Sequence, residues 1–212
     1  MDTWEMVDAD RAELADLTDT LTPEQWDAPT LCTAWKVRDV VAHVTDGATL
    51  TKPQALGIAA KYGFRINKLL NDEAIKGGKR PVPELCTAWR ATVGSRRTPP
   101  GVKAAGMLTD ELIHQQDIRR SLGIPRQIPT DRLRVVLDET AKTGRSYLPA
   151  AKRIKGLHLR AADLDWETGD PSGEEVTGPG EALVMAMAGR PAALAYLSGP
   201  GVATLRTRMG DG

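Results

Sequence analysis

The sequence predicts an α+β protein, in which a helical N-terminal part, residues 1–148, precedes a small α+β part, residues 149–212. Three observations predict this division. Before residue 148, apolar residues recur three and four positions apart, which is the spacing of amphipathic helices. After residue 150, the segment Leu157–Ala161 alternates apolar and polar residues, as a half-buried strand does. The 212 residues also suffice for one or two domains that bury their own cores.

The first 50 residues contain three segments that we expect to be helical. Residues 3–19 carry apolar side chains at helical spacing between acidic ones. Thr22 and Pro23 predict the start of a short second helix, because threonine caps helix N-termini and proline suits the first helical position. The third segment, residues 37–50, is rich in valine, which by propensity favours strands. Its apolar positions nevertheless follow the i, i+3, i+4, i+7 spacing of a helix: Val37, Val40, Val41 and Val44.

The rest of the N-terminal part is also predicted to be mainly helical. Gly123 followed by Pro125 is a helix-stop signal, and the basic, proline-containing residues 95–100 predict a loop. The expected helical segments are residues 53–76, with breaks near Pro53 and at 77–78, and then residues 83–93, 103–122 and 130–144.

The C-terminal part combines short strands and short helices. Its expected elements are a strand over residues 157–161, a turn-rich hairpin over 165–173, a helix over 181–188, a short helix from Pro191, and a final strand over 202–208. A helical part followed by a part that contains both strands and helices is the basis for the predicted α+β class.

Composition excludes several classes of function. Lys+Arg and Asp+Glu are both 28, and only 4% of the residues are aromatic, which argues against nucleic-acid binding. No apolar run reaches the ~18 residues of a membrane-spanning helix. The N-terminus is acidic and lacks the basic and apolar regions of a signal peptide. Cys32 and Cys86 suit a reduced compartment. We therefore expect a cytoplasmic protein that binds neither nucleic acid nor membranes.

Two of the three histidines form a candidate metal site with a carboxylate. Asp110 and His114 are four residues apart and so share one helix face. His43, which lies among valines on another helix, is the natural third donor. Two histidines and one carboxylate leave a coordination position open, which is the pattern of catalytic zinc sites. The same donors also suit ferrous iron or nickel.

Other interpretations of these residues stay open. Glu111 is three residues from His114 and is an alternative to Asp110 as the ligand. Without a metal, Asp110 and His114 form an ordinary surface pair, and the imidazole of His43 is buried against a carbonyl. Cys32 is expected to serve in packing, as is Cys86. The sequence contains no phosphate loop, dinucleotide fingerprint or nucleophile elbow.

Three stretches of the sequence resemble one family. Residues 21–44 contain Leu-Thr, Trp, Cys and then Trp-Lys-Val-Arg-Asp-Val-Val-Ala-His, and this pattern resembles the start of the mycothiol-dependent maleylpyruvate isomerase family. Residues 110–123 resemble its second signature, with an acidic residue four before a histidine and then Asp-Ile-Arg-Arg and Leu-Gly. Residues 159–199 resemble its small C-terminal domain. The resemblance runs in order over nearly the whole chain.

The resemblance implies a DinB-like four-helix bundle with a divalent metal, commonly zinc, held by His43, Asp110 and His114. The founding isomerases have glutamate at the position of Asp110, so this chain departs from the family there. The resemblance places the sulfur of mycothiol on the open metal position. In the isomerases the thiolate adds to a conjugated double bond, allows rotation and leaves. A C-terminal arginine is linked to that function, and Arg206 or Arg208 is its candidate counterpart.

The family resemblance favours a metal-dependent enzyme that uses mycothiol, a low-molecular-weight thiol, on a small-molecule substrate, as an isomerase or an S-transferase. One alternative is a DinB-like hydrolase that acts through metal-bound water. Another is a metal-binding protein without catalytic activity. Activity that depends on the thiol separates the first hypothesis from the second.

Overall fold

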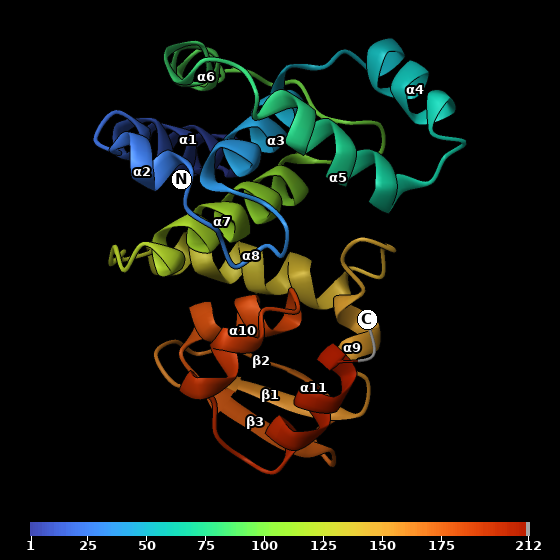
Figure 1. The fold of residues 1–212 in the computed structure, drawn as a ribbon. Coiled ribbons are helices and arrows are strands. Elements are labelled where there is room, and N and C mark those ends of the chain that lie inside the picture. Colours follow the sequence, from blue (N-terminus) through green and yellow to red (C-terminus); the bar gives the residue numbers. More distant parts are fainter. Residues whose placement is uncertain (211–212) are drawn as a thin grey trace. The chain divides into compact units, whose positions relative to one another are not determined.

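Helices make up most of the chain and a small sheet completes it, which confirms the predicted α+β class. The computed structural model describes residues 1–210. The chain divides into two compact units, Met1–Arg126 and Gln127–Gly212, each with its own core (Figure 1). Within residues 1–210, no helix combines the length and the apolar character needed to cross a membrane.

The first unit is entirely helical. In this unit α1 packs against α6 and α7, while α3 packs against α5, α6 and α7 (Figure 1). The helices are α1 (Thr3–Thr18), α2 (Pro23–Trp26), α3 (Val37–Thr49), α4 (Lys52–Lys61), α5 (Ile66–Gly77), α6 (Val82–Arg90) and α7 (Ala104–Ser121).

Local sequence signals account for several helix ends in this unit. Thr22 caps α2 as predicted, in a reciprocal capping box with Gln25. The predicted helical region 53–76 consists of two helices. Pro53 lies in the first turn of α4 and so begins the helix rather than breaking it. The break comes between α4 and α5, where Gly63 and Phe64 both have a positive φ.

The valine-rich segment forms the helix α3, so the spacing of its apolar residues outweighs their strand propensity. The four valines are at most 1% exposed. They belong to a core that also contains Trp26, Leu85, Trp89 and Ile118. The core therefore spans α2, α3, α6 and α7, and it holds α3 against α7.

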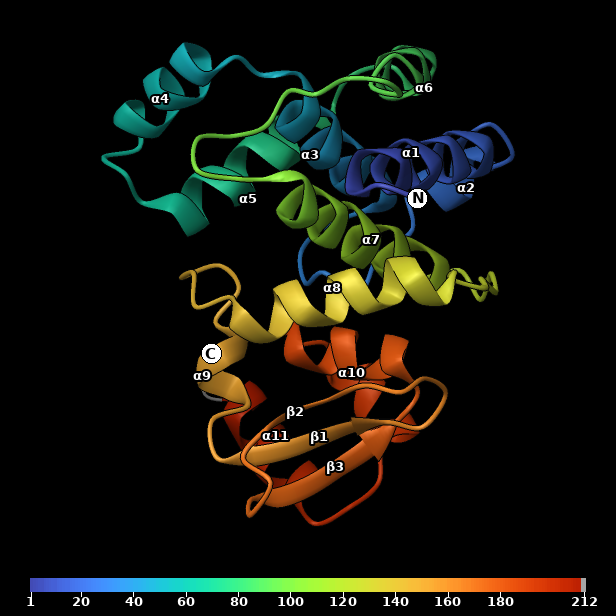
Figure 2. The same ribbon diagram turned by 180° about the vertical axis from the view of Figure 1, so that it is seen from behind.

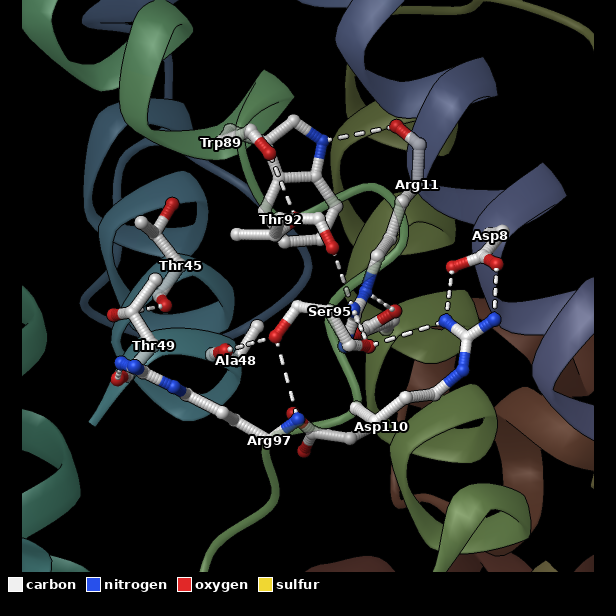
Figure 3. A network of polar contacts seen from close by, with 12 residues as sticks. Asp8, Arg11, Thr45, Ala48, Thr49, Trp89, Thr92, Ser95, Arg97 and Asp110 are labelled. Carbon is white, nitrogen blue, oxygen red and sulfur yellow. Dashed lines mark hydrogen bonds and ion pairs between the residues drawn. The ribbon is translucent and has the colours of Figure 1, made fainter. Parts of the chain in front are cut away.

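A buried ion pair joins α1 to α7 (Figure 3). The side chains of Arg11 and Glu111 are fully buried, and their closest atoms, Nη2 and Oε1, lie 2.7 Å apart. Arg11 Nε donates to both carboxylate oxygens of Glu111. Its Nη1 donates to the main-chain oxygens of Thr92 and Ser95, at 2.8 Å and 2.9 Å. The main-chain oxygen of Arg11 accepts from Trp89 Nε1. One arginine thus links α1, α7 and the segment that follows α6.

The second unit contains a three-stranded sheet with helices packed against it. Its strands are β1 (Leu157–Ala161), β2 (Glu167–Gly169) and β3 (Glu174–Gly178), in the order β2-β1-β3. β1 pairs antiparallel with β2 and parallel with β3. Figure 2 shows the strands in front and α11 behind them. The helices are α8 (Thr130–Lys142), α9 (Ala150–Arg153), α10 (Gly180–Met187), the 3-10 helix η1 (Pro191–Tyr196) and α11 (Gly201–Gly210).

The boundary between the two compact units differs from the predicted one at residue 148. It lies after Arg126, because α8 packs against α10 and α9 of the second unit. The turn-rich segment 165–173 contains β2, but β2 forms its hairpin with β1 and not with the strand that follows it. That strand, β3, was not expected from the sequence.

The predicted final strand over residues 202–208 is wrong, since Gly201–Gly210 forms the helix α11. The buried residues of α11 are Gly201 and Leu205, which are four positions apart and therefore lie on one helix face. Gly201 is close enough to β3 that a Cβ there would lie 2.7 Å from the side chain of Val176. Packing of this apolar face against β3 favours the helix.

The stability of the protein should depend on pH through Glu111. Burial raises the pKa of Glu111 to about 8, although Arg11 acts in the opposite direction. Because the folded protein holds this proton more tightly than the unfolded chain, the contribution of Glu111 to stability is complete below its ordinary pKa of 4.5 and is lost as the pH rises through 8. Urea unfolding of wild type and Glu111→Gln should show that their difference in unfolding free energy falls across this range. A difference that grows with pH would contradict this.

Candidate metal centre

The helices α3 and α7 bring the three predicted ligands together. His43 Nε2 lies 3.6 Å from Asp110 Oδ2, and His114 Nε2 lies 3.7 Å from Asp110 Oδ1. One ligand atom from each residue lies within 4.8 Å of the other two. Both imidazoles are largely buried, whereas the side chain of Asp110 is 38% exposed. The carboxylate therefore lies between the two rings, at the solvent-facing side of the group.

A second carboxylate orients the ring of His114. Asp117 Oδ2 lies 3.0 Å from His114 Nδ1, and the side chain of Asp117 is fully buried. An Nδ1–H that donates to Asp117 leaves the lone pair of Nε2 facing Asp110. Metal-binding histidines almost always have such an outer partner, which sets the tautomer and the ring orientation. The sequence places Asp117 on this face of α7, three residues after His114, but its role follows only from the structure.

Trp35 holds the two imidazoles from the side. The ring centroid of Trp35 lies 4.8 Å from that of His43 and 5.5 Å from that of His114. Its Nε1 donates to Asn71 Oδ1 on α5 at 3.1 Å. Trp35 is 8% exposed, so this side of the histidine pair is shielded from water. The preceding residue, Ala34, has a φ of 73°, a left-handed conformation that an alanine adopts only at a cost.

The donor set suits a divalent metal of the zinc type. Zinc bonds of about 2.0–2.2 Å in a tetrahedron put neighbouring donor atoms about 3.3 Å apart. The two nitrogen–oxygen separations of 3.6 Å and 3.7 Å differ from this value by a few tenths of an ångström. Small side-chain rotations would close that difference. Two imidazoles and one carboxylate leave one of four positions for another ligand.

Glu111, the alternative ligand, faces elsewhere. Its carboxylate takes three hydrogen bonds from Arg11 in the core. It belongs to neither of the candidate metal-binding groups among the described residues. Asp110 is therefore the acidic residue that the fold presents to His43 and His114.

Cys32 lies closer to this site than the sequence indicated. Its Sγ, a nitrogen of His114 and an oxygen of Asp117 lie within 4.8 Å of one another. The loop that carries Cys32 is held to α7 by a hydrogen bond from the main-chain nitrogen of Leu31 to the main-chain oxygen of Asp117. Cys32 does not form a disulfide with Cys86. The thiol thus lies beside His114 and Asp117.

A pocket of about 260 Å³ opens beside His43 and Asp110. Apolar side chains from α4, α5 and α7, together with Leu50 and Pro99, line most of it. Asp46 also lines the pocket, and burial raises the pKa of its carboxyl although Arg80 acts against this. The pocket is lined by His43, Asp46, Gly47, Leu50, Ala55, Ile58, Leu69, Leu70, Glu73, Ala74, Pro99, Met107 and Asp110.

The candidate residues of the second unit have local partners. Arg208 Nη1 donates to the main-chain oxygens of Arg153 and Lys155, at 2.7 Å and 2.8 Å, whereas Arg206 is exposed. These contacts give Arg208 a structural role after α9. The side chain of His158 is 16% exposed, and its Nε2 lies 3.6 Å from Glu167 Oε2.

Comparison with known proteins finds one family that the N-terminal part of the chain resembles. Residues 7–98 match the family model described as the mycothiol maleylpyruvate isomerase N-terminal domain. This match confirms the resemblance. The matched segment contains His43, while Asp110 and His114 lie beyond it. No curated protein sequence matches the chain.

Two solved structures share the fold over nearly the whole chain. One is the mycothiol-dependent maleylpyruvate isomerase, with a TM-score of 0.58 and 13% sequence identity. The other is a histidine-to-alanine mutant of the mycothiol-dependent maleylpyruvate isomerase, with a TM-score of 0.59 and 12% identity. In both cases the likeness covers 93% of this chain and 91% of the other. At such low identity the likeness shows the fold alone.

Replacing Asp117 by asparagine should weaken metal binding without unfolding the protein. The amide cannot act as the anionic partner of His114 Nδ1, and loss of such a partner typically lowers metal affinity by about 10–100-fold. Titration of zinc against a chromogenic chelator measures the effect. Asp46→Asn is the matched control, because Asp46 lines the pocket but pairs with Arg80 outside the donor group. Equal losses in the two variants would show that Asp117 has no special role.

Proposed function

We propose that this protein is a metal-dependent enzyme that uses a low-molecular-weight thiol, mycothiol, to transform a small molecule by isomerisation or S-transfer. The metal is a divalent ion of the zinc type held by His43, Asp110 and His114. The resemblance of the chain to the mycothiol-dependent maleylpyruvate isomerase family supports the choice of thiol.

One observation carries the proposal. The Nδ1 of His114 contacts the buried carboxylate of Asp117, and its Nε2 lies near Asp110. His43, on α3, also faces Asp110. This arrangement prepares two imidazole lone pairs and one carboxylate for a single ion. A structural zinc site is closed by four protein donors, whereas this group offers three and borders a pocket.

The chain's own residues have distinct tasks in this proposal. A bound divalent metal lowers the pKa of a thiol or a water that it binds, and so makes it a nucleophile near neutral pH. Asp117 keeps the ring of His114 in place. Trp35 excludes water from the side of the two histidines that it packs against. The apolar walls of the pocket hold a small molecule beside the open position.

The use of aspartate rather than glutamate is part of the proposal. Asp110 has a shorter side chain than the glutamate of the founding isomerases, yet one of its oxygens lies 3.6 Å from His43 Nε2 and the other lies 3.7 Å from His114 Nε2. Glu111, the adjacent acidic residue, is held by Arg11. The helix α7 therefore offers only the shorter carboxylate to the ion.

We also propose that α1, α3, α6 and α7 form the DinB-like four-helix bundle. The support is their pairing: α1 packs against α7, α7 against α3, α3 against α6, and α6 against α1. Four helices that pair in such a closed cycle surround one core, and metal sites in bundles are built from side chains on facing helices.

Loading the protein with cobalt(II) tests the thiol directly, without knowledge of the substrate. Addition of mycothiol should produce an intense near-ultraviolet band of thiolate-to-cobalt charge transfer, because a sulfur ligand enters the open position. The Cys32→Ser background is needed, since the protein's own thiol lies near His114. In that background His114→Ala should lose both the cobalt and the band, while His158→Ala, altered in the second unit, should retain both.

Two outcomes would contradict the proposal. A cobalt-loaded protein that shows no band with mycothiol favours the hydrolase, in which the open position holds water. A His114→Ala variant that binds cobalt as tightly as wild type removes the proposed site itself. Circular dichroism of each variant shows whether the helices are intact.

A further inference from the structure

The pocket beside the candidate metal centre has walls of a particular chemistry. Eight of its lining residues are apolar: Leu50, Ala55, Ile58, Leu69, Leu70, Ala74, Pro99 and Met107. Its titratable lining residues are His43 and three acidic residues, Asp46, Glu73 and Asp110. No lysine or arginine belongs to this lining. The pocket thus offers apolar surface and carboxylates, but no cation.

The basic side chains that pair with Asp46 and Glu73 are occupied. Arg80 Nη2 lies 3.2 Å from Asp46 Oδ1, and its Nε donates to the main-chain oxygen of Gly77. Lys76 lies 3.3 Å from Glu73, whose carboxylate also accepts from the hydroxyl of Tyr62. These cations offset the acidic residues of the pocket and are not directed at a ligand.

Arg97 lies near the end of α3 and is the third basic residue to consider. Its Nη1 donates to the main-chain oxygen of Thr49 at 2.9 Å, where it caps the last turn of that helix (Figure 3). A cation near a helix C-terminus is stabilised by the helix dipole. Arg97 therefore has a role in the fold that keeps its guanidinium outside the pocket lining.

Charge decides which ligands such a pocket accepts. Moving a carboxylate from water into apolar surroundings costs several kcal/mol unless charged or hydrogen-bonding partners replace the water. Binding sites for carboxylates supply such partners, most often arginine. A dicarboxylate would meet three acidic side chains here. An uncharged ligand carries no such cost and gains from contact with the apolar walls.

We propose that this pocket binds an uncharged, apolar small molecule, and that the substrate of this protein is a neutral electrophile rather than a dicarboxylate such as maleylpyruvate. The statement about the substrate rests on the proposed function. The statement about which ligands the pocket prefers rests only on the residues that line it. A volume of about 260 Å³ is near the lower end of ligand pockets, so the ligand is a small one.

The charge of a bound metal leaves this preference in place. Two positive charges of a zinc-type ion are offset by one negative charge from Asp110 and one from a thiolate at the open position. The loaded site is then close to neutral. No uncompensated positive charge is then left to bind either carboxylate of a dicarboxylate. The apolar walls therefore still determine which ligand binds.

Binding of a matched pair of probes tests the preference. Methyl cinnamate and cinnamate share an aromatic ring and a conjugated double bond, but only cinnamate is charged; maleate serves as the dicarboxylate. Isothermal titration of the Cys32→Ser protein, without added thiol, should show that methyl cinnamate binds at least ten times more tightly than either anion. The titration uses metal-free protein, because a zinc ion without the thiolate would carry an uncompensated charge that attracts anions, whereas the predicted preference comes from the lining.

Two pocket-filling variants and one control variant place the probe. Leu70→Trp fills the pocket from α5 and should weaken binding of methyl cinnamate at least tenfold. Leu56→Trp makes the same change at a site on α4 that is 57% exposed and outside the lining, and should leave binding unchanged within twofold. Ala55→Trp also fills the pocket, and it spares the core because α4 has no buried residue.

The outcomes separate this inference from the proposed function. Tighter binding of maleate than of methyl cinnamate in metal-free protein overturns the inference, and so does the absence of binding by methyl cinnamate. Equal effects of Ala55→Trp and Leu56→Trp overturn the location. None of these readouts needs metal or mycothiol, so a failed cobalt–thiolate experiment would leave the ligand preference supported and would refute only the enzyme's chemistry.

Discussion

The buried pair of Arg11 and Glu111 is the constraint on which the candidate site depends. Both side chains are fully withdrawn from water, so the pair is tolerated only because hydrogen bonds from one arginine satisfy Glu111, Thr92 and Ser95 at once. This requirement sets the rotation of α7 about its axis. Successive helix residues differ by about 100° in direction. With Glu111 directed at α1, Asp110 is directed at His43 on α3.

The rotation gives α7 two chemically different faces. The face toward α1 carries Glu111, while Asp110, His114 and Asp117 follow one another at intervals of four and three along the other. Along that second face the side chains change from the partly exposed Asp110 to the fully buried Asp117. The imidazole between them is therefore held by a buried acid and faces a more accessible one. Trp35, held by Asn71 on α5, completes the enclosure.

Different elements carry the chemistry and the ligand preference of the first unit. The three donors come from α3 and α7, which lie in the core, whereas many of the pocket walls come from α4 and α5. The helix α4 has no buried residue and packs mainly against α5. Changes in its sequence therefore cost little stability. The walls of the pocket can therefore change while the group of His43, Asp110 and His114 on α3 and α7 stays the same.

The sequence by itself determined what depends on local periodicity: the helices of the first unit, the cap at Thr22, the strand at Leu157–Ala161 and the shared face of Asp110 and His114. It also placed His43 on a buried face, since four valines surround it in the helical pattern. Only the tertiary structure decided between Asp110 and Glu111, because the deciding partner, Arg11, is 100 residues away. It likewise decided that Cys32 approaches His114, that α8 joins the second unit, and that residues 201–210 form a helix against β3. The physical reason is the same in each case. A short segment carries the spacing of its own apolar and polar residues, but the residues that pack against it, and so decide which of its faces is used, come from a distant part of the chain.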